Sequence, residues 1–218
     1  MASTARSTHA AQHPSDALDL TENVAGAAAR ARLEATHAQA PVLNLCARVM
    51  GVKTDERAWR IGAAGEEMVG RRLEKLGPEW EVLHSIEVGD GATYIDHAVI
   101  GPPGVFTVST KHRPNGKAIV DSRCVWVNGL HTHHVRNSRH EARHAEWLLT
   151  EACHFKVPVS PVIVFVDLAE MKVKQMPDDV QVTTLPTLLD WLESRPARLS
   201  PATVAAIHQR ARWSTTWY

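Results

Sequence analysis

A helical metal-binding pattern is the first feature of this sequence that could carry chemistry. Residues His140-Glu141-Ala142-Arg143-His144 match H-E-x-x-H. On a helix, two histidines four residues apart face the same side and can bind Zn²⁺, with the glutamate as general base of a metalloprotease. Arg143 places a cation between these histidines, and no third ligand is indicated further along the chain. Zinc proteolysis is therefore an alternative and not the main hypothesis.

Positive side chains gather in one stretch of a chain whose net charge is zero. The 24 Lys and Arg residues balance 24 Asp and Glu residues, so no global field attracts nucleic acid or an anionic membrane. A site for a polyanion must be a local patch, which suits a phosphate backbone but is also typical of a solvated surface. The patch residues are Lys111, His112, Arg113, Lys117, Arg136, Arg139 and Arg143. Three nearby histidines, His131, His133 and His134, are expected to be exposed, and phosphate contacts are their other possible role.

Length and composition favour one main domain in a reducing compartment. A chain of 218 residues with 44% hydrophobic content can bury one sizeable core. The three cysteines are scattered and lack a C-x-x-C pair, which argues against a disulfide framework or a cysteine zinc site. No segment has the pattern of a signal peptide or the roughly 18 apolar residues of a membrane span. We expect a soluble, cytoplasmic protein with no membrane partner.

Turn signals and periodicity divide the chain into an N-terminal extension, residues 1–58, and an α/β domain, residues 59–218. The extension is expected to be disordered up to about residue 20, then helical over Leu20–Gln39, with a linker over Gly51–Arg57. In the domain, a helix precedes a three-strand meander, and a further hairpin is expected to close at Asn128-Gly129. The predicted strands are 80–88, 94–100, 105–111, 119–120, 124–127, 162–166 and 180–183, and the predicted helices are 63–76, 137–153, 187–193 and 201–212. This order is typical of a mixed α/β sandwich.

Apolar residues also predict which parts are buried. The run Val162–Val166 is almost continuously apolar, which is typical of a strand buried on both faces. The tryptophans fall mainly at apolar positions of predicted elements, so we expect them in the core. They are Trp59, Trp80, Trp126, Trp147, Trp191 and Trp213, whereas Trp217 has no predicted place.

Consecutive motifs between Gly62 and Asp167 resemble those of bacterial nuclease-related domains. They are GAAGEEMVGRRLEKL, WEVLHSIEVG, YIDHAVIGPPGVFTVSTKHRPNGK and WVNG. The most diagnostic part is Ile95-Asp96-His97, followed by a Gly/Pro turn, Gly-Val-Phe and a strand that ends in Thr-Lys. The tail, with PDDVQV and the closing STTWY, resembles the actinobacterial branch of the family. The resemblance implies a restriction-endonuclease-like fold, an α/β domain with a mixed sheet flanked by helices.

The resemblance also implies a set of catalytic residues. In this fold an Asp lies on one strand and Glu-x-Lys on the next, often with a Glu from the preceding helix. Asp96 matches the strand Asp, Lys111 the Lys and Glu66 the helix Glu, while Ser109 stands where the strand Glu is expected. Because side chains alternate along a strand, Ser109 and Lys111 share one face and can both point at Asp96.

The implied reaction is Mg²⁺-dependent hydrolysis of a phosphodiester bond. Carboxylates would hold Mg²⁺ beside the phosphate, while the lysine orients or activates water and offsets phosphate charge. A serine hydroxyl is a weak neutral ligand, so Glu141 is our candidate for a relocated third carboxylate beside Asp96 and Glu66. The residues expected to contact DNA or RNA are Lys111, Arg113, Lys117, Arg136 and Arg139.

Ser109 leaves two classes of function open. A third carboxylate close to Asp96 in space would favour a nuclease, and its absence would favour a catalytically inactive module that binds nucleic acid or protein. The sequence does not distinguish DNA from RNA or indicate an oligomeric state.

Overall fold

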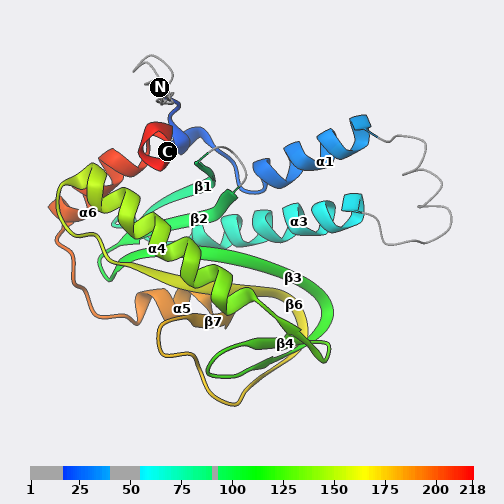
Figure 1. The fold of residues 1–218 in the computed structure, drawn as a ribbon. Helices are drawn as coiled ribbons and strands as arrows, with labels where there is room; N and C mark the ends of the chain where they lie inside the picture. Colours follow the sequence, from blue (N-terminus) through cyan, green and yellow to red (C-terminus); the bar gives the residue numbers. More distant parts are fainter. Residues whose placement is uncertain (1–16, 40–54, 90–92) are drawn as a thin grey trace, which may run out of the picture.

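The protein has three layers, with a seven-stranded mixed sheet between two layers of helices (Figure 1). A computed structural model describes residues 17–39, 55–89 and 93–218. Helices α4 (His134–Cys153) and α6 (Pro201–Ala211) cover one face of the sheet, and α3 (Asp55–Leu73) and α5 (Leu188–Glu193) cover the other. The strands are β1 (Glu81–Val88), β2 (Thr93–Gly101), β3 (Gly104–Val120), β4 (Val125–Val127), β5 (Leu130–Thr132), β6 (Val159–Val173) and β7 (Gln181–Thr184). The predicted fold class is confirmed, and no helix in these ranges is long and apolar enough to cross a membrane.

The long strand β3 organises the sheet. Its first part pairs with β2 in antiparallel fashion, up to the pair Val108 and His97. Its last part pairs with β4, beginning at Ala118. Along its other side β3 pairs in parallel with β6, with a bulge around Gly116. On one side, therefore, β3 changes its partner between residues 108 and 118.

Strand β6 is buried on both faces, as its apolar run predicts. Val162, Val164 and Val166 pack in the cluster under α3 and α5. Ile163 and Phe165 point to the opposite face, under the beginning of α4. The prediction for this strand is confirmed, although β6 extends beyond Val166 to Val173.

The two strands predicted at 119–120 and 124–127 do pair in antiparallel fashion, but Asn128-Gly129 does not close their hairpin. Residues 119–120 belong to the end of β3. The turn joins β4 to β5, and its two residues have φ values of 51° and 78°, which suit Asn and Gly. Strand β5 is three residues long and largely exposed, so it carries no apolar alternation that would have indicated it.

The N-terminal segment packs on the domain over its described residues. The Leu20 side chain is 5% exposed and joins the core, and its amide donates to the Arg212 carbonyl at 2.7 Å. Asp19 forms an ion pair with Arg212. The expectation that about the first 20 residues do not contact the core is therefore wrong for residues 17–20, because Leu20 buries its apolar side chain there. Residues 1–16 lie outside the described ranges.

Helices in this region also differ from their predicted bounds. Helix α1 (Ala27–Gln39) begins later than expected and lies along α3 (Figure 1). Helix α3 begins at Asp55 instead of residue 63, so the boundary expected between residues 58 and 59 falls inside a helix. Most of the predicted linker, residues 51–54, lies outside the described ranges. Gly65 sits where an added Cβ would lie 2.6 Å from the Cβ of His112, which explains a glycine in the middle of this helix.

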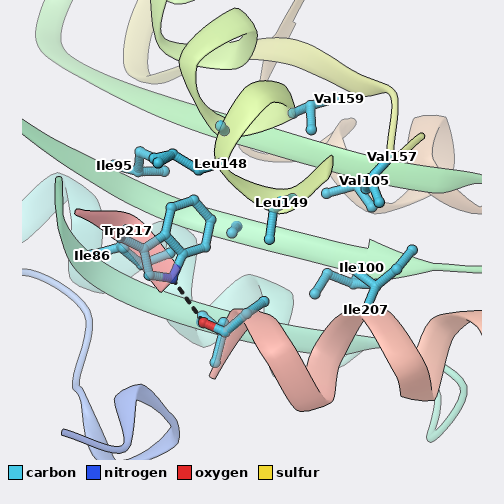
Figure 2. Packing of buried hydrophobic residues seen from close by; sticks show 14 of the residues in the cluster. Ile86, Ile95, Ile100, Val105, Leu148, Leu149, Val157, Val159, Ile207 and Trp217 are labelled. Atoms are coloured by element: carbon cyan, nitrogen blue, oxygen red, sulfur yellow. Dashed lines mark hydrogen bonds between the residues drawn. The ribbon is translucent and has the colours of Figure 1, made fainter. Parts of the chain in front are cut away.

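Trp217 is the centre of the core between β1, β2, α4 and α6. It lies in the 3-10 helix η3 (Ser214–Trp217), is 0% exposed, and its Nε1 donates to the Ala211 carbonyl at 2.8 Å. Figure 2 shows its ring among Ile86, Ile95 and Leu149. Three other tryptophans are wrongly predicted as core: Trp126, Trp147 and Trp213 are 40%, 58% and 38% exposed. Trp126, for example, points outward between two buried valines of β4.

Trp217→Ala is expected to lower the free energy of unfolding by about 3–5 kcal/mol, because it leaves a large cavity and an unpaired carbonyl. Urea denaturation measures the change. Trp147→Ala is the matched control, and its change should stay below about 1 kcal/mol because this side chain is mostly exposed. Equal losses in the two variants would contradict the place of Trp217 in the core.

Candidate active site

The candidate site lies where β2 separates from β3. The strands pair as far as His97 and Val108. At the residue before His97, the contact between the strands is made by a side chain instead of the backbone. The Asp96 Oδ2 accepts a hydrogen bond from the Thr110 amide at 2.7 Å. Asp96, Ser109 and Lys111 line one cavity of about 760 Å³, which we call the wide cavity. The expected alternation thus brings Ser109 and Lys111 to the same side as Asp96.

Ser109 holds the lysine. The Lys111 Nζ donates to the Ser109 Oγ at 2.7 Å and to the Thr110 carbonyl at 3.1 Å. Ser109 is 7% exposed, so its contact with the ammonium group takes place largely away from bulk water. The serine therefore fixes the position of the cation at the edge of the wide cavity.

Two glutamates approach Asp96 from opposite layers of the molecule. Glu141 belongs to α4 and lines the wide cavity. Glu66 belongs to α3 and lines a second cavity of about 110 Å³, which we call the narrow cavity. Asp96 lines both cavities, so the three acids converge from a strand and two helices.

The convergence changes the acidity of all three groups. Burial, and then the negative charge of Asp96, raise the pKa of Glu66 to about 8 and that of Glu141 to about 8. Burial also raises the pKa of Asp96, while Lys111 and the hydrogen bond from Thr110 act in the opposite direction. Without a cation, both glutamates are therefore mainly protonated at neutral pH.

These acids fit a hard cation without forming a closed set of ligands. The Glu141 Oε1 is buried and has no hydrogen-bond partner within the described ranges. Burying a polar atom without a partner costs free energy. A bound cation would give this oxygen a partner and would favour the ionised form of the acids. No three His, Cys, Asp or Glu side chains of the described residues are close enough together to hold an ion as they stand. This arrangement suits a cation that keeps several waters and binds through one or two carboxylates.

The H-E-x-x-H motif does not form a zinc site among the described residues. His140 and His144 border the wide cavity, but no third ligand joins them. His140 is exposed, and the His144 ring stacks on Trp147 with 6.1 Å between centroids. Of this motif, only Glu141 faces the other acids.

The predicted nucleic-acid contacts divide into two groups. Lys111, Arg113 and Arg136 line the wide cavity. Arg139 instead pairs with Asp179 at 2.6 Å, and Lys117 pairs with Glu170 at 3.5 Å. Both partners lie far along the chain, so the sequence pattern gave no sign of these ion pairs.

His134 is a site residue that the sequence reading placed on the surface. It lines the wide cavity, and its Nε2 is buried without a hydrogen-bond partner in the described part of the chain. Burial, followed by the charges of Lys111 and Arg113, lowers the pKa of His134 to about 4. Its ring is therefore neutral beside the cations.

Residues 61–166 match the family model of the nuclease-related domain. The chain contains a nuclease-related domain. The match includes Glu66, Asp96, Ser109, Lys111 and Glu141, so the whole candidate catalytic set lies within this domain. It ends before the tail that resembles the actinobacterial branch, and this finer assignment stays a prediction.

One curated protein is similar in sequence to part of this chain. An uncharacterized protein of Bacillus anthracis is 39% identical over 84 residues, which cover 36% of this chain and 39% of that protein. The chain thus spans about two fifths of the length of this curated relative. No solved structure matches the chain.

Glu141→Gln is expected to make the stability of the metal-free protein less dependent on pH. Because folding raises the pKa of Glu141 from 4.5 to about 8, the folded state holds this proton more tightly than the unfolded state. The resulting stabilisation is complete below about pH 4.5 and is lost as the pH rises through about 8. Thermal unfolding in chelator, compared between wild type and variant at each pH, isolates this contribution.

The matched control is Glu151→Gln, an exposed glutamate of the same helix, which should leave the slope unchanged. If Glu141→Gln keeps the wild-type slope, the raised pKa of Glu141 is wrong.

Proposed function

We propose that the protein is a Mg²⁺-dependent hydrolase of phosphodiester bonds in nucleic acid. The observation that carries this proposal is the convergence of Glu66, Asp96 and Glu141 beside Lys111. The nuclease-related domain supports a nuclease-related function for the same residues. We propose that this reaction takes place in the cytoplasm, which the scattered cysteines favour.

Each residue then has a distinct role. When bound, Mg²⁺ supplies positive charge to a phosphate oxygen and lowers the pKa of its water. Asp96 and Glu141 would hold it in the wide cavity, with Glu66 as an accessory carboxylate. Lys111, which Ser109 and the Thr110 carbonyl hold in place, orients the attacking water and offsets phosphate charge.

The remaining cavity residues bind the substrate. Arg113 and Arg136 line the wide cavity, and they would hold phosphates that flank the scissile bond. His134 offers a neutral ring nitrogen, so it can exchange a hydrogen bond with the substrate without adding charge.

Ser109 favours the second candidate function, an inactive module that binds nucleic acid or protein. The acids argue against it, because a surface that only binds a polyanion gains nothing from three buried acidic groups, whose charge when ionised repels phosphate. Burying such groups is costly unless they are protonated or bind a cation. The enzyme is therefore the better supported of the two functions.

Cleavage assays test the proposed enzyme directly. With Mg²⁺ and labelled single- and double-stranded DNA and RNA, Asp96→Asn and Lys111→Met should each lower the rate by at least about 100-fold, the low end for the loss of a positioned catalytic group. Asp178→Asn, an exposed acid outside both cavities, serves as control and should cut at the wild-type rate. Cleavage that persists in Asp96→Asn, or in chelator, would contradict the proposal.

Ser109→Glu is expected to strengthen the site. The new carboxylate would face the Lys111 ammonium that the serine contacts now, so the variant should fold, and it should bind Mg²⁺ about tenfold more tightly and cut faster. Ser109→Gln has the same size without the charge and should keep the wild-type affinity, as measured by calorimetry with Mg²⁺. If the wild type cuts nothing, and folded Ser109→Glu neither cuts nor binds Mg²⁺ more tightly, the binding module replaces the enzyme.

A further inference from the structure

Three flat side chains surround the narrow cavity on the far side of Asp96. Arg32 of α1 lies over two aromatic rings, with its guanidinium carbon 5.2 Å from the centroid of Trp59 and 4.6 Å from that of Tyr94. The rings come from α3 and β2, and all three residues line the narrow cavity together with Glu66 and Asp96. A polar, planar surface therefore adjoins the catalytic acids.

The two cavities border the same short segment of β2. Tyr94, Ile95 and Asp96 line both of them. The cations Lys111, Arg113 and Arg136 belong to the wide cavity. A nucleic-acid backbone that reaches Asp96 from the wide cavity would therefore have the narrow cavity close to that phosphate.

We propose that the narrow cavity binds one unpaired nucleobase next to the scissile phosphate, and that the substrate is therefore a single-stranded nucleic acid. This inference rests on the proposed function, because it assigns the substrate class of the same site.

Size and charge select a base over other parts of the substrate. A volume of about 110 Å³ is well below the roughly 300–1,000 Å³ of sites for drug-sized ligands, so the cavity admits one ring system and not a base pair. Glu66 and Asp96 in its wall repel a phosphate whenever they are ionised. Bases stack on aromatic rings and on guanidinium planes in single-strand recognition.

Base pairing prevents entry into this cavity. A base inside a duplex must leave its stack and its partner before it can occupy a pocket. This costs free energy, and the cost is lower for a base that is already single-stranded. The preference for single strands follows from that difference.

The recognition surface also extends beyond the family match. Arg32 and Trp59 both precede residue 61, where the match to the nuclease-related domain begins. Helix α1 and the beginning of α3 therefore add Arg32 and Trp59 to a pocket whose third flat side chain, Tyr94, belongs to the matched domain.

Binding without cleavage tests the inference. Fluorescence anisotropy in chelator compares a labelled single-stranded DNA with the same strand in a duplex. Trp59→Leu and Tyr94→Leu should each weaken single-strand binding by about 5- to 150-fold, the range for loss of one stacked base, and should change duplex binding by less than about twofold. Tyr94→Phe keeps the ring and should bind like the wild type.

Trp213→Leu is the matched control. Trp213 is also partly exposed and carries an arginine, with the Arg212 guanidinium carbon 5.3 Å from its ring centroid, but it lines neither cavity. This variant should bind single strands like the wild type. A second measurement uses the unaltered protein: photocross-linking to a bromouracil-substituted single strand should attach Trp59 or Tyr94, as mapped by mass spectrometry.

The outcomes separate this inference from the proposed function. A protein that cuts nucleic acid, but whose Trp59→Leu and Tyr94→Leu variants bind single strands unchanged or lose duplex binding equally, overturns the base pocket alone. Cross-links that all map outside the narrow cavity do the same. A wild type that binds neither single strands nor duplex overturns both proposals.

Discussion

The exchange of partners along β3 is the constraint on which the rest of the site depends. On one side, β2 stops pairing at Val108 and β4 begins at Ala118. Had either strand continued, its backbone would cover residues 109–117 and leave no room for a cavity. Strand β6 pairs with β3 along its other side at residues 109–112 and again from Gly116, so β3 is held on both flanks of the bulge while one edge is open. At that edge, the bond from the Thr110 amide to the Asp96 carboxylate stands in place of the interrupted ladder.

Elements with strong apolar periodicity could be predicted from the sequence, and those that depend on a neighbour could not. The helix predicted at 137–153 begins three residues earlier, and the strand predicted at 162–166 matches the buried part of β6, because their apolar faces are complete in themselves. The far halves of β3 and β6 are mostly polar or exposed and pair with each other, so neither half looks like a strand alone. The first turns of α3 overlap and follow the predicted linker Gly51–Arg57, and their packing against α1 is not visible in the sequence.

Only those relations within the site that follow from order and spacing along the chain could be predicted. Alternation along β3 relates Ser109 to Lys111, and the family resemblance adds Asp96. Glu141 was a candidate by its position on a helix, but its approach to Asp96 from the opposite layer to Glu66 is a property of the fold. The same holds for Arg139, which has Asp179 as its partner. Charge clusters in a sequence do not show which cations are already paired, because the acids that pair them come from distant parts of the chain.

The parallel pairing of β3 with β6 has a consequence for how this protein folds. Parallel neighbours need a long crossover connection, and here the crossover contains α4, the helix that carries Glu141. Contacts between strands so far apart in the chain form slowly, since the intervening loop must close before they are gained. Docking of β6 against β3 therefore also brings α4 down onto the sheet. Asp96 and Lys111 lie on strands that follow each other in the chain, whereas Glu141 joins them only through this long-range contact, so the full set of charges depends on it.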